Sequence, residues 1–401
     1  MSLITGDDVV WLLPPDWSQP VIETLTWLTD VGMSRTGVRQ KRQLRLAPRR
    51  GFSFRVVDDA VARRLMSLMR AGAGAGPWQL PIWHDAQRLA AGLDAGAESI
   101  PCATAGYDFA AGAKALLWTS PADCEVVDIA AVADEGLTLD GATAASWPAG
   151  SRLYPLRRAL LLTPPQESFL SAAASATAVE FQLDEPCDWP ALLPDVEYGD
   201  APLLEDRPSE PQDWSASWGR QLQQTDPQTG RITVLDQPGR PFRAQQTFWQ
   251  IAGRQDNAAF RSLLYGLAGR WSGPQGGLWL PSWSQDLRLA APAAEDATQI
   301  RIEWCGYTRY GLQRPGVRDI RIEVAGGDTP YARIIDSVED GSTELLTLDG
   351  PLGSAITPGN VRQISFVAFM QLASDAIELQ HVTDADGLTT CELDWEATDE
   401  Q

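Results

Sequence analysis

The chain contains two copies of one sequence pattern. Leu80-Pro81-Ile82-Trp83 returns as Leu280-Pro281-Ser282-Trp283, and in each copy Arg-Leu-Ala-Ala follows, from Arg88 and from Arg288. The shift between the copies is 281 − 81 = 200 residues. Because a pattern that recurs at long spacing is the signature of a duplicated unit, the repeat predicts two related domains in one chain.

Further matches extend the repeat. Gly106-Tyr107 recurs as Gly306-Tyr307, and Leu-Thr-Leu-Asp-Gly occurs at 137–141 and at 346–350, a shift of 346 − 137 = 209 residues. The longer shift indicates a loop insertion in the second copy. The repeat predicts core positions, and strand-ending turns at the two aspartates: Leu80, Pro81, Trp83, Leu280, Pro281, Trp283, Asp140 and Asp349.

Composition excludes several classes of protein. The 401 residues, 44% of them hydrophobic, are enough for two cores. A formal net charge of −21 argues against binding to the phosphates of nucleic acids. The five cysteines form no Cys-x-x-Cys pair, and no apolar run or leader-like N-terminus is present. We therefore expect a protein folded in a reducing cytoplasm, without a membrane segment.

The local patterns predict the elements of each copy. Alternation at 38–46 and at 52–56 predicts two strands. A helix near 58–71 is predicted to bury Val61, Leu65, Leu68 and Met69, and the second copy repeats this order with a helix near 257–270. We expect a mainly β fold with a few helices (α+β). It would consist of two homologous β-sandwich or barrel domains, each with one packed helix and an appended β module.

Prolines suggest the domain boundaries. The segment 164–211 is acidic and rich in proline, which disfavours regular strands, so we expect an extended arm between a first repeat at 1–163 and a second at 212–401. The run that begins at Trp11 resembles the run that begins at Trp189. This similarity predicts an extended lead-in before each repeat.

Catalytic and cofactor motifs are missing from the sequence. His84 and His381 have no metal-ligand spacing around them, and the counterpart of His84 in the other copy is Ser284. No nucleophile elbow, phosphate loop or zinc-protease motif occurs. We expect no cofactor, no metal and no enzymatic activity.

Two groups of residues are candidates for subunit contacts. Basic side chains crowd one predicted strand of an otherwise acidic protein, and tryptophans occur in the extended segments. Such groups suit charge complementarity and aromatic anchoring between subunits. A solvated strand face is the alternative for the basic group. The candidates are Arg39, Lys41, Arg42, Arg45, Trp189, Trp214 and Trp218.

The sequence resembles a family of phage proteins. The stretches 29–31, 34–37 and 48–50, the helix and Leu80-Pro81-Ile82-Trp83 resemble the ring-forming domain of distal tail and baseplate proteins of long-tailed, non-contractile bacteriophages. In the second half, 225–230, Gly269-Arg270 and 278–281 are similar to the same prophage tail proteins.

The resemblance implies a structural role in the virion. Such proteins form a ring at the distal end of the tail tube, connect the tube to the tail tip and fibres, and leave a channel for DNA. The implied partners are tail tube, tape measure and hub or fibre proteins, and the implied location is the tail tip after assembly in the host cytoplasm. Two ring domains in one chain favour a trimer with pseudo-six-fold symmetry, with a hexamer second.

Two other functions stay open. A receptor- or carbohydrate-binding tail module would need the repeated tryptophans exposed in a groove. A cell-wall glycan hydrolase would need two carboxylates across a cleft, but the chain has 53 acidic residues, so their presence alone decides nothing.

Overall fold

The computed structural model describes residues 4–5, 8–34, 39–73, 77–209, 215–269, 276–384 and 387–398. The protein is mainly β, with 46% strand, 9% helix and a large antiparallel sheet. Within these ranges the helices are α1 (Ala60–Ala73), α2 (Arg254–Gly269) and α3 (Tyr307–Tyr310), besides a 3₁₀ turn, η1 (Trp83–Asp85). None of the helices described is long and apolar enough to cross a membrane.

The first half of the chain is built around two long strands and a helix. Strand β6 runs into α1, which leads to β7 and then, after a module, to the closing strands β13 and β15. The strands of this half are β2 (Asp8–Val10), β3 (Val21–Thr26), β6 (Arg49–Asp58), β7 (Trp78–Pro81), β10 (Lys114–Ser120), β13 (Arg152–Leu160), β14 (Glu167–Phe169) and β15 (Ser175–Leu183).

The second half follows the same order. Strand β21 runs into α2, then come β22, a module and the closing strands. Its strands are β18 (Ala216–Gly219), β21 (Phe242–Ile251), β22 (Leu278–Pro281), β24 (Asp319–Val324), β27 (Val361–Leu372), β28 (Ala376–His381) and β29 (Thr389–Ala397).

Strand pairing is equivalent in the two halves. Strand β13 pairs with β7, β10 and β15, and β27 pairs with β22, β24 and β29 in the same way. The repeated prolines occupy matching positions, because Pro81 lies opposite Leu156 and Pro281 lies opposite Val367. The sequence repeat therefore corresponds to a repeated topology.

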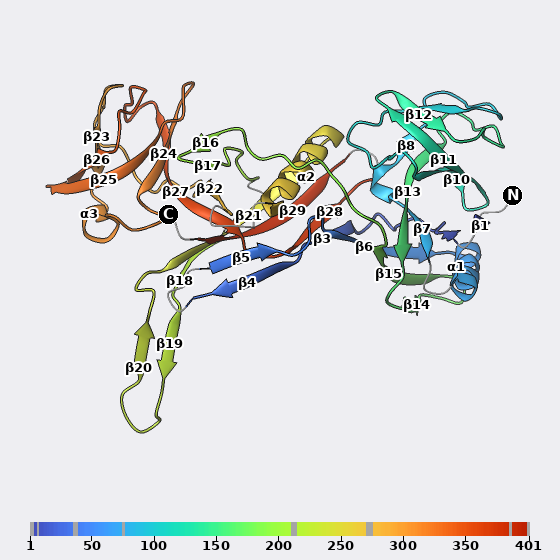
Figure 1. Cartoon of the computed structure of the whole chain (residues 1–401), viewed down its shortest axis with the longest axis horizontal. Helices are drawn as coiled ribbons and strands as arrows, with labels where there is room; N and C mark the ends of the chain where they lie inside the picture. Colours follow the sequence, from blue (N-terminus) through green and yellow to red (C-terminus); the bar gives the residue numbers. More distant parts are fainter. Residues whose placement is uncertain are drawn as a thin grey trace.

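Each half carries a smaller β module with its own core. The first contains β8 (Gln87–Arg88), β9 (Ser99–Pro101), β11 (Asp123–Ala133) and β12 (Gly136–Leu139). The second contains β23 (Gln299–Glu303), β25 (Tyr331–Asp340) and β26 (Thr343–Leu348). The two modules lie at opposite ends of the elongated molecule (Figure 1).

One antiparallel sheet joins the halves. Strand β28 of the second half pairs with β3 of the first, from Ala376 opposite Thr26 to His381 opposite Val21. The resulting strand order is β14-β15-β6-β3-β28-β29-β21-β18. Alternate residues face the cores beneath α1 and α2, and the others face away from both cores.

Two hairpins extend from this sheet. The first is formed by β4 (Thr29–Met33) and β5 (Arg39–Gln43), and the second by β19 (Leu222–Thr225) and β20 (Thr233–Asp236). The β4–β5 hairpin is anchored to the second half, whereas the β19–β20 hairpin projects away from the molecule (Figure 1). The remaining short strands are β1 (Ile4–Thr5), β16 (Glu197–Tyr198) and β17 (Ala201–Pro202).

The proline-rich arm begins later than the sequence predicted. Residues 175–183 form β15, which pairs with β6 from Ser175 to Gln182, so the expectation of an arm from 164 is wrong for this part. The alternation of Val179, Phe181 and Leu183 with polar residues explains the strand. The segment from 184 to 209 contains only the short β16–β17 pair, and its 189–193 portion packs against the core beside α2.

The lead-in of the second half is also not where the sequence similarity placed it. Trp11 donates its backbone N–H to Gln79 O at 2.9 Å, and Leu204 donates to Trp279 O at 3.0 Å. These two bonds are equivalent, since β2 and the segment around Leu203 run parallel to β7 and β22. The counterpart of Trp11 is therefore Leu204 and not Trp189.

The helices lie close to the predicted ranges, but the buried face of α1 differs. Met66 and Met69 are buried, whereas Val61 is 66% and Leu68 is 71% exposed. The prediction that these two residues belong to the core is wrong, because α1 packs on the sheet through one narrow face and nothing in the described chain covers its outer side.

Candidate functional site: the junction between the halves and the free sheet edges

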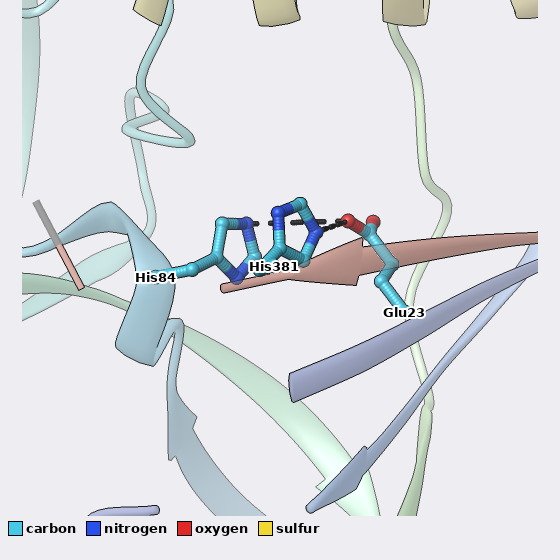
Figure 2. Close-up of side chains that lie close together, drawn as sticks. All are labelled: Glu23, His84 and His381. Carbon is cyan, nitrogen blue, oxygen red and sulfur yellow. Dashed lines mark hydrogen bonds and ion pairs between the residues drawn. The ribbon is translucent and has the colours of Figure 1, made fainter. Parts of the chain in front are cut away.

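A buried ionic cluster lies where the halves meet. Glu23 on β3 is fully buried and accepts hydrogen bonds from Arg50 on β6 and from Arg261 on α2, the latter at 2.5 Å. His381 Nε2 lies 2.8 Å from the same carboxylate (Figure 2). Glu23 therefore connects a first-half strand to a second-half strand and helix.

A second set of ion pairs extends the cluster. Asp85 in η1 pairs with Arg254 of α2 at 2.6 Å, and Asp108 pairs with Arg50 and Arg157. Arg254 also lies over the ring of Tyr107, at 4.9 Å from its centre. The repeated Gly106 approaches α2 so closely that a Cβ there would lie 2.9 Å from Arg254 O, which explains why glycine suits this position.

The charges of the cluster satisfy one another. Although burial opposes it, the guanidinium groups of Arg261 and Arg50 hold the pKa of Glu23 well below its usual range. Arg50 and Arg157 likewise lower the pKa of Asp108, again against burial. Such pairing offsets the desolvation cost of buried charges, and losing one partner would leave an uncompensated charge.

The two histidines, which no sequence pattern connects, stack in this cluster. The rings of His84 and His381 are parallel within 2° at 3.6 Å, and both face Glu23 (Figure 2). Burial lowers the pKa of both histidines, and for His84 the neighbouring His381 lowers it further. Burial therefore favours the neutral form of both rings.

The donor set of Glu23, His84 and His381 resembles a metal site in composition. One ligand atom of each lies within 4.8 Å of the others. However, Glu23 already binds two guanidinium groups, and Arg254 lies on the other side of Asp85. A divalent cation here would displace Arg50 or Arg261 and face the remaining positive charges, so the residues do not fit a metal.

The apolar repeat residues lie inside the protein, whereas the two repeated aspartates lie at its surface. Trp83 and Trp283 are each 3% exposed, and Leu80, Pro81, Leu280 and Pro281 are buried. Asp140 and Asp349 are exposed and follow the equivalent strands β12 and β26, where Asp349 Oδ1 accepts the backbone N–H of Arg333 at 2.9 Å.

The basic strand does not form a free surface as a whole. Lys41 is buried against the second half, where it pairs with Glu396 at 3.1 Å and donates to Leu372 O at 3.2 Å. Arg45 donates to Thr26 O at 3.0 Å, and Arg42 is exposed. The prediction of a subunit contact is wrong for Lys41, because its acidic partner belongs to the same chain. Arg39 lies on β5, but its side chain is outside the described part.

The candidate tryptophans have different surroundings. Trp189 donates to Ser262 Oγ at 3.1 Å and lies under Arg261, so it is an intramolecular anchor of the arm on α2. Trp218 on β18 is 48% exposed. Trp214 lies outside the described residues.

The two ends of the joined sheet have free edges among the described strands. Strand β14 pairs with β15 alone, and β18 pairs with β21 alone. Beside β18, a cavity of about 600 Å³ is lined by Trp218, Pro241, Tyr307, Tyr310, Arg309 and Arg314, among others. The unpaired backbone groups of an edge strand can form hydrogen bonds with a strand of another chain.

The free edges are equivalent to the strands of the junction. Strand β18 holds the place beside β21 that β3 holds beside β6, and β14 holds the place beside β15 that β28 holds beside β29. At the junction the space between η1 and α2 is filled, since the corresponding cavity has only about 20 Å³. The 600 Å³ cavity is lined by Gly306, the counterpart of Gly106, which packs against α2 at the junction.

A scan against protein-family models finds no match for this chain, and a search of the curated proteins finds none either. The function is therefore inferred from the geometry of the chain itself.

Proposed function

We propose that this protein is a structural virion component that forms a ring at the distal end of a phage tail tube. The ring would connect the tube to the tail tip and fibres and leave a channel through which DNA passes. One observation carries the proposal, namely the pair of free edges that match the two strands of the internal junction. In this proposal the halves are homologous ring domains, and the chain has no catalytic role.

The equivalence of the edges supports a closed assembly. If β18 of one copy pairs with β14 of the next as β3 pairs with β28, each contact between copies repeats the contact within a chain. A heterologous contact of this kind generates a ring or a filament. Three chains supply six halves, which gives the ring the expected pseudo-six-fold symmetry, and a trimer is therefore favoured over a hexamer.

The charge of the open sheet face supports a channel for DNA. The side that faces away from α1 and α2 carries more acidic than basic side chains: Glu180, Glu378, Glu392 and Asp394 against Arg49 and Arg55, while Glu396 is paired with Lys41 of the β4–β5 hairpin. In a ring closed through β14 and β18, this face lines the opening. An acidic lining repels phosphates, so that DNA slides without binding.

The carbohydrate-binding alternative has little support. It required Trp83 and Trp283 to be exposed in a groove, and both are buried. The acidic residues that come together at the junction are buried and neutralised by arginines, so they do not provide the acid pair of a glycan hydrolase.

Native mass spectrometry and electron microscopy of the purified chain test the proposal. We expect trimers that appear as rings with a central opening, and rings of the same size at the end of the tail tube in assembled particles. A protein that remains monomeric up to high micromolar concentration, or compact particles without an opening, would overturn it.

A further inference from the structure

Arg243 of the second half is the counterpart of Arg50. Each arginine lies two residues after a proline, Pro48 or Pro241, and two residues before the position that pairs with Phe181 or Trp395. Both arginines are buried. The fold therefore places one buried guanidinium beside the junction strand β3 and another beside its counterpart β18.

The two arginines differ in their partners. Arg50 is paired with Glu23, which lies on β3 opposite Phe52. The matching position on β18 is Ala216, opposite Gln245. In the described part of the chain, Arg243 forms no ion pair: it donates to Gln245 Oε1 at 2.9 Å and lies over the ring of Trp218. The carboxylate of Asp286 acts on Arg243 only through its charge, without a salt bridge.

The strand that would pair with β18 carries the missing carboxylate. At the junction, Leu379 of β28 lies opposite Glu23, and Leu379 itself pairs with Cys391 of β29. On β14 the matching position is Glu167, which pairs with Thr177 of β15. Within the chain, the carboxylate of the pair is Glu23 on β3, and Leu379 on β28 lies opposite it. Between two copies, Ala216 on β18 would lie opposite Glu167 on β14, so the carboxylate would come from the other strand.

Glu167 is only partly satisfied in the single chain. Its Oε2 lies 3.8 Å from Arg70 of α1, while its Oε1 is buried and has no hydrogen-bond partner among the described residues. Glu23 shows what a complete site looks like, because it bridges Arg50 of one half and Arg261 on the helix of the other.

We propose that Glu167 of a second copy pairs with Arg243, and so bridges Arg243 and its own Arg70 across the contact between subunits. This inference rests on the ring proposed above and assigns its contact a register: Glu167 opposite Ala216 and Ser168 opposite Ser215. In a desolvated contact such a charged pair contributes strongly, since truncating either partner leaves the other buried and unpaired.

A double-mutant cycle tests the pair. We expect Glu167→Gln and Arg243→Gln each to weaken association of the subunits about 30-fold or more, and the double variant to be scarcely weaker than either single variant. Glu180→Gln, on the open face of β15, is the matched control and should leave association unchanged. Thermal unfolding at concentrations where the protein is monomeric separates loss of association from loss of folding.

Cysteine pairs test the register independently of charge. We expect Ser168→Cys with Ser215→Cys to form intermolecular disulfides under mild oxidation that end at a covalent trimer, while Ser168→Cys with Ser217→Cys reacts far less. A wild-type protein that never associates would overturn the proposed ring. A trimer with additive effects in the cycle and no preferred cysteine pair would overturn the register and the Glu167–Arg243 pair alone.

Discussion

Asp58 is an unusual aspartate at the end of β6. Both of its carboxylate oxygens are buried without a hydrogen-bond partner in the described chain. Burial, with Glu167 and Asp59 nearby, raises its pKa to about 6. Because this pKa is above that of the unfolded chain, the folded state is favoured by protonation and loses stability as the pH rises through 6.

Replacing Asp58 by asparagine should therefore stabilise the monomer at neutral pH. We expect the free energy of unfolding of Asp58→Asn to exceed that of the wild type by up to about 3 kcal/mol at pH 7.5, and the gain to vanish toward pH 4. Denaturant unfolding at both pH values measures this. Asp59→Asn is the control, because Asp59 accepts the N–H groups of Val61 and Ala62 and asparagine also caps helices. A gain that is independent of pH would contradict the explanation.

The stacked histidines make the junction sensitive to acid. Their pKa values are lowered in the folded protein, so the unfolded chain takes up protons first. Stability should fall as the pH drops from about 6.5 toward 5, before the carboxylates of the cluster titrate. His84→Phe keeps an aromatic ring beside His381 and should flatten this dependence, measured by denaturant midpoints between pH 8 and pH 5. An unchanged slope would contradict the assignment to His84.

Among the elements, the two hairpins differ in how they are anchored: one is fixed to the rest of the chain, and the other exposes apolar side chains. The β4–β5 hairpin is fixed to the other half through Lys41, and backbone N–H groups at its base bind Asp375. Its counterpart, β19–β20, exposes apolar side chains to about half of their area: Leu222, Ile232, Val234 and Leu235. Exposed apolar arms of this kind are typical of contacts with other subunits.

Removing the β19–β20 hairpin should separate assembly from folding. We expect deletion of residues 222–236, with a short glycine-serine turn in their place, to change the free energy of unfolding of the monomer by less than about 0.5 kcal/mol. The same deletion should abolish association. Deletion of the β4–β5 hairpin is the control and should destabilise the monomer, since Glu396 loses Lys41. If the β19–β20 deletion still forms trimers, the hairpin has no part in the contact.

For the whole molecule, the charge of the open sheet face should determine whether a ring of this protein retains DNA or repels it. Its acids come from strands of both halves, among them Glu378, Glu392 and Asp394. We expect the wild-type ring not to retain linear duplex DNA, and a variant with lysine at these three positions to retain it in a salt-dependent manner. Lysine at Glu98, Asp134 and Glu135, in the outer module, is the matched control. Equal DNA retention by both variants would show that this face does not line the channel.

The repeated, mainly β character of the protein can be predicted from local sequence patterns. Alternation along β6 and β15 is written in successive residues, and the Leu-Pro-x-Trp elements mark equivalent buried strands because a large indole in a core tolerates few replacements. The same local patterns did not show that Val61 and Leu68 face outward. Helical spacing identifies an apolar stripe on a helix, but it does not show which part of the stripe is covered by the rest of the protein.

The way in which the halves meet could not be predicted from local patterns, because it depends on contacts between distant parts of the chain. Glu23 and His381 are 358 positions apart, and no spacing rule connects a strand near one end of the chain to a strand near the other. The pairing of β3 with β28 depends on both sheets being already formed, with matching edges and a shared buried charge. Arg243 and Glu167 could not be singled out from the sequence for the same reason. Their proposed pairing depends on where β18 and β14 lie in the folded sheet.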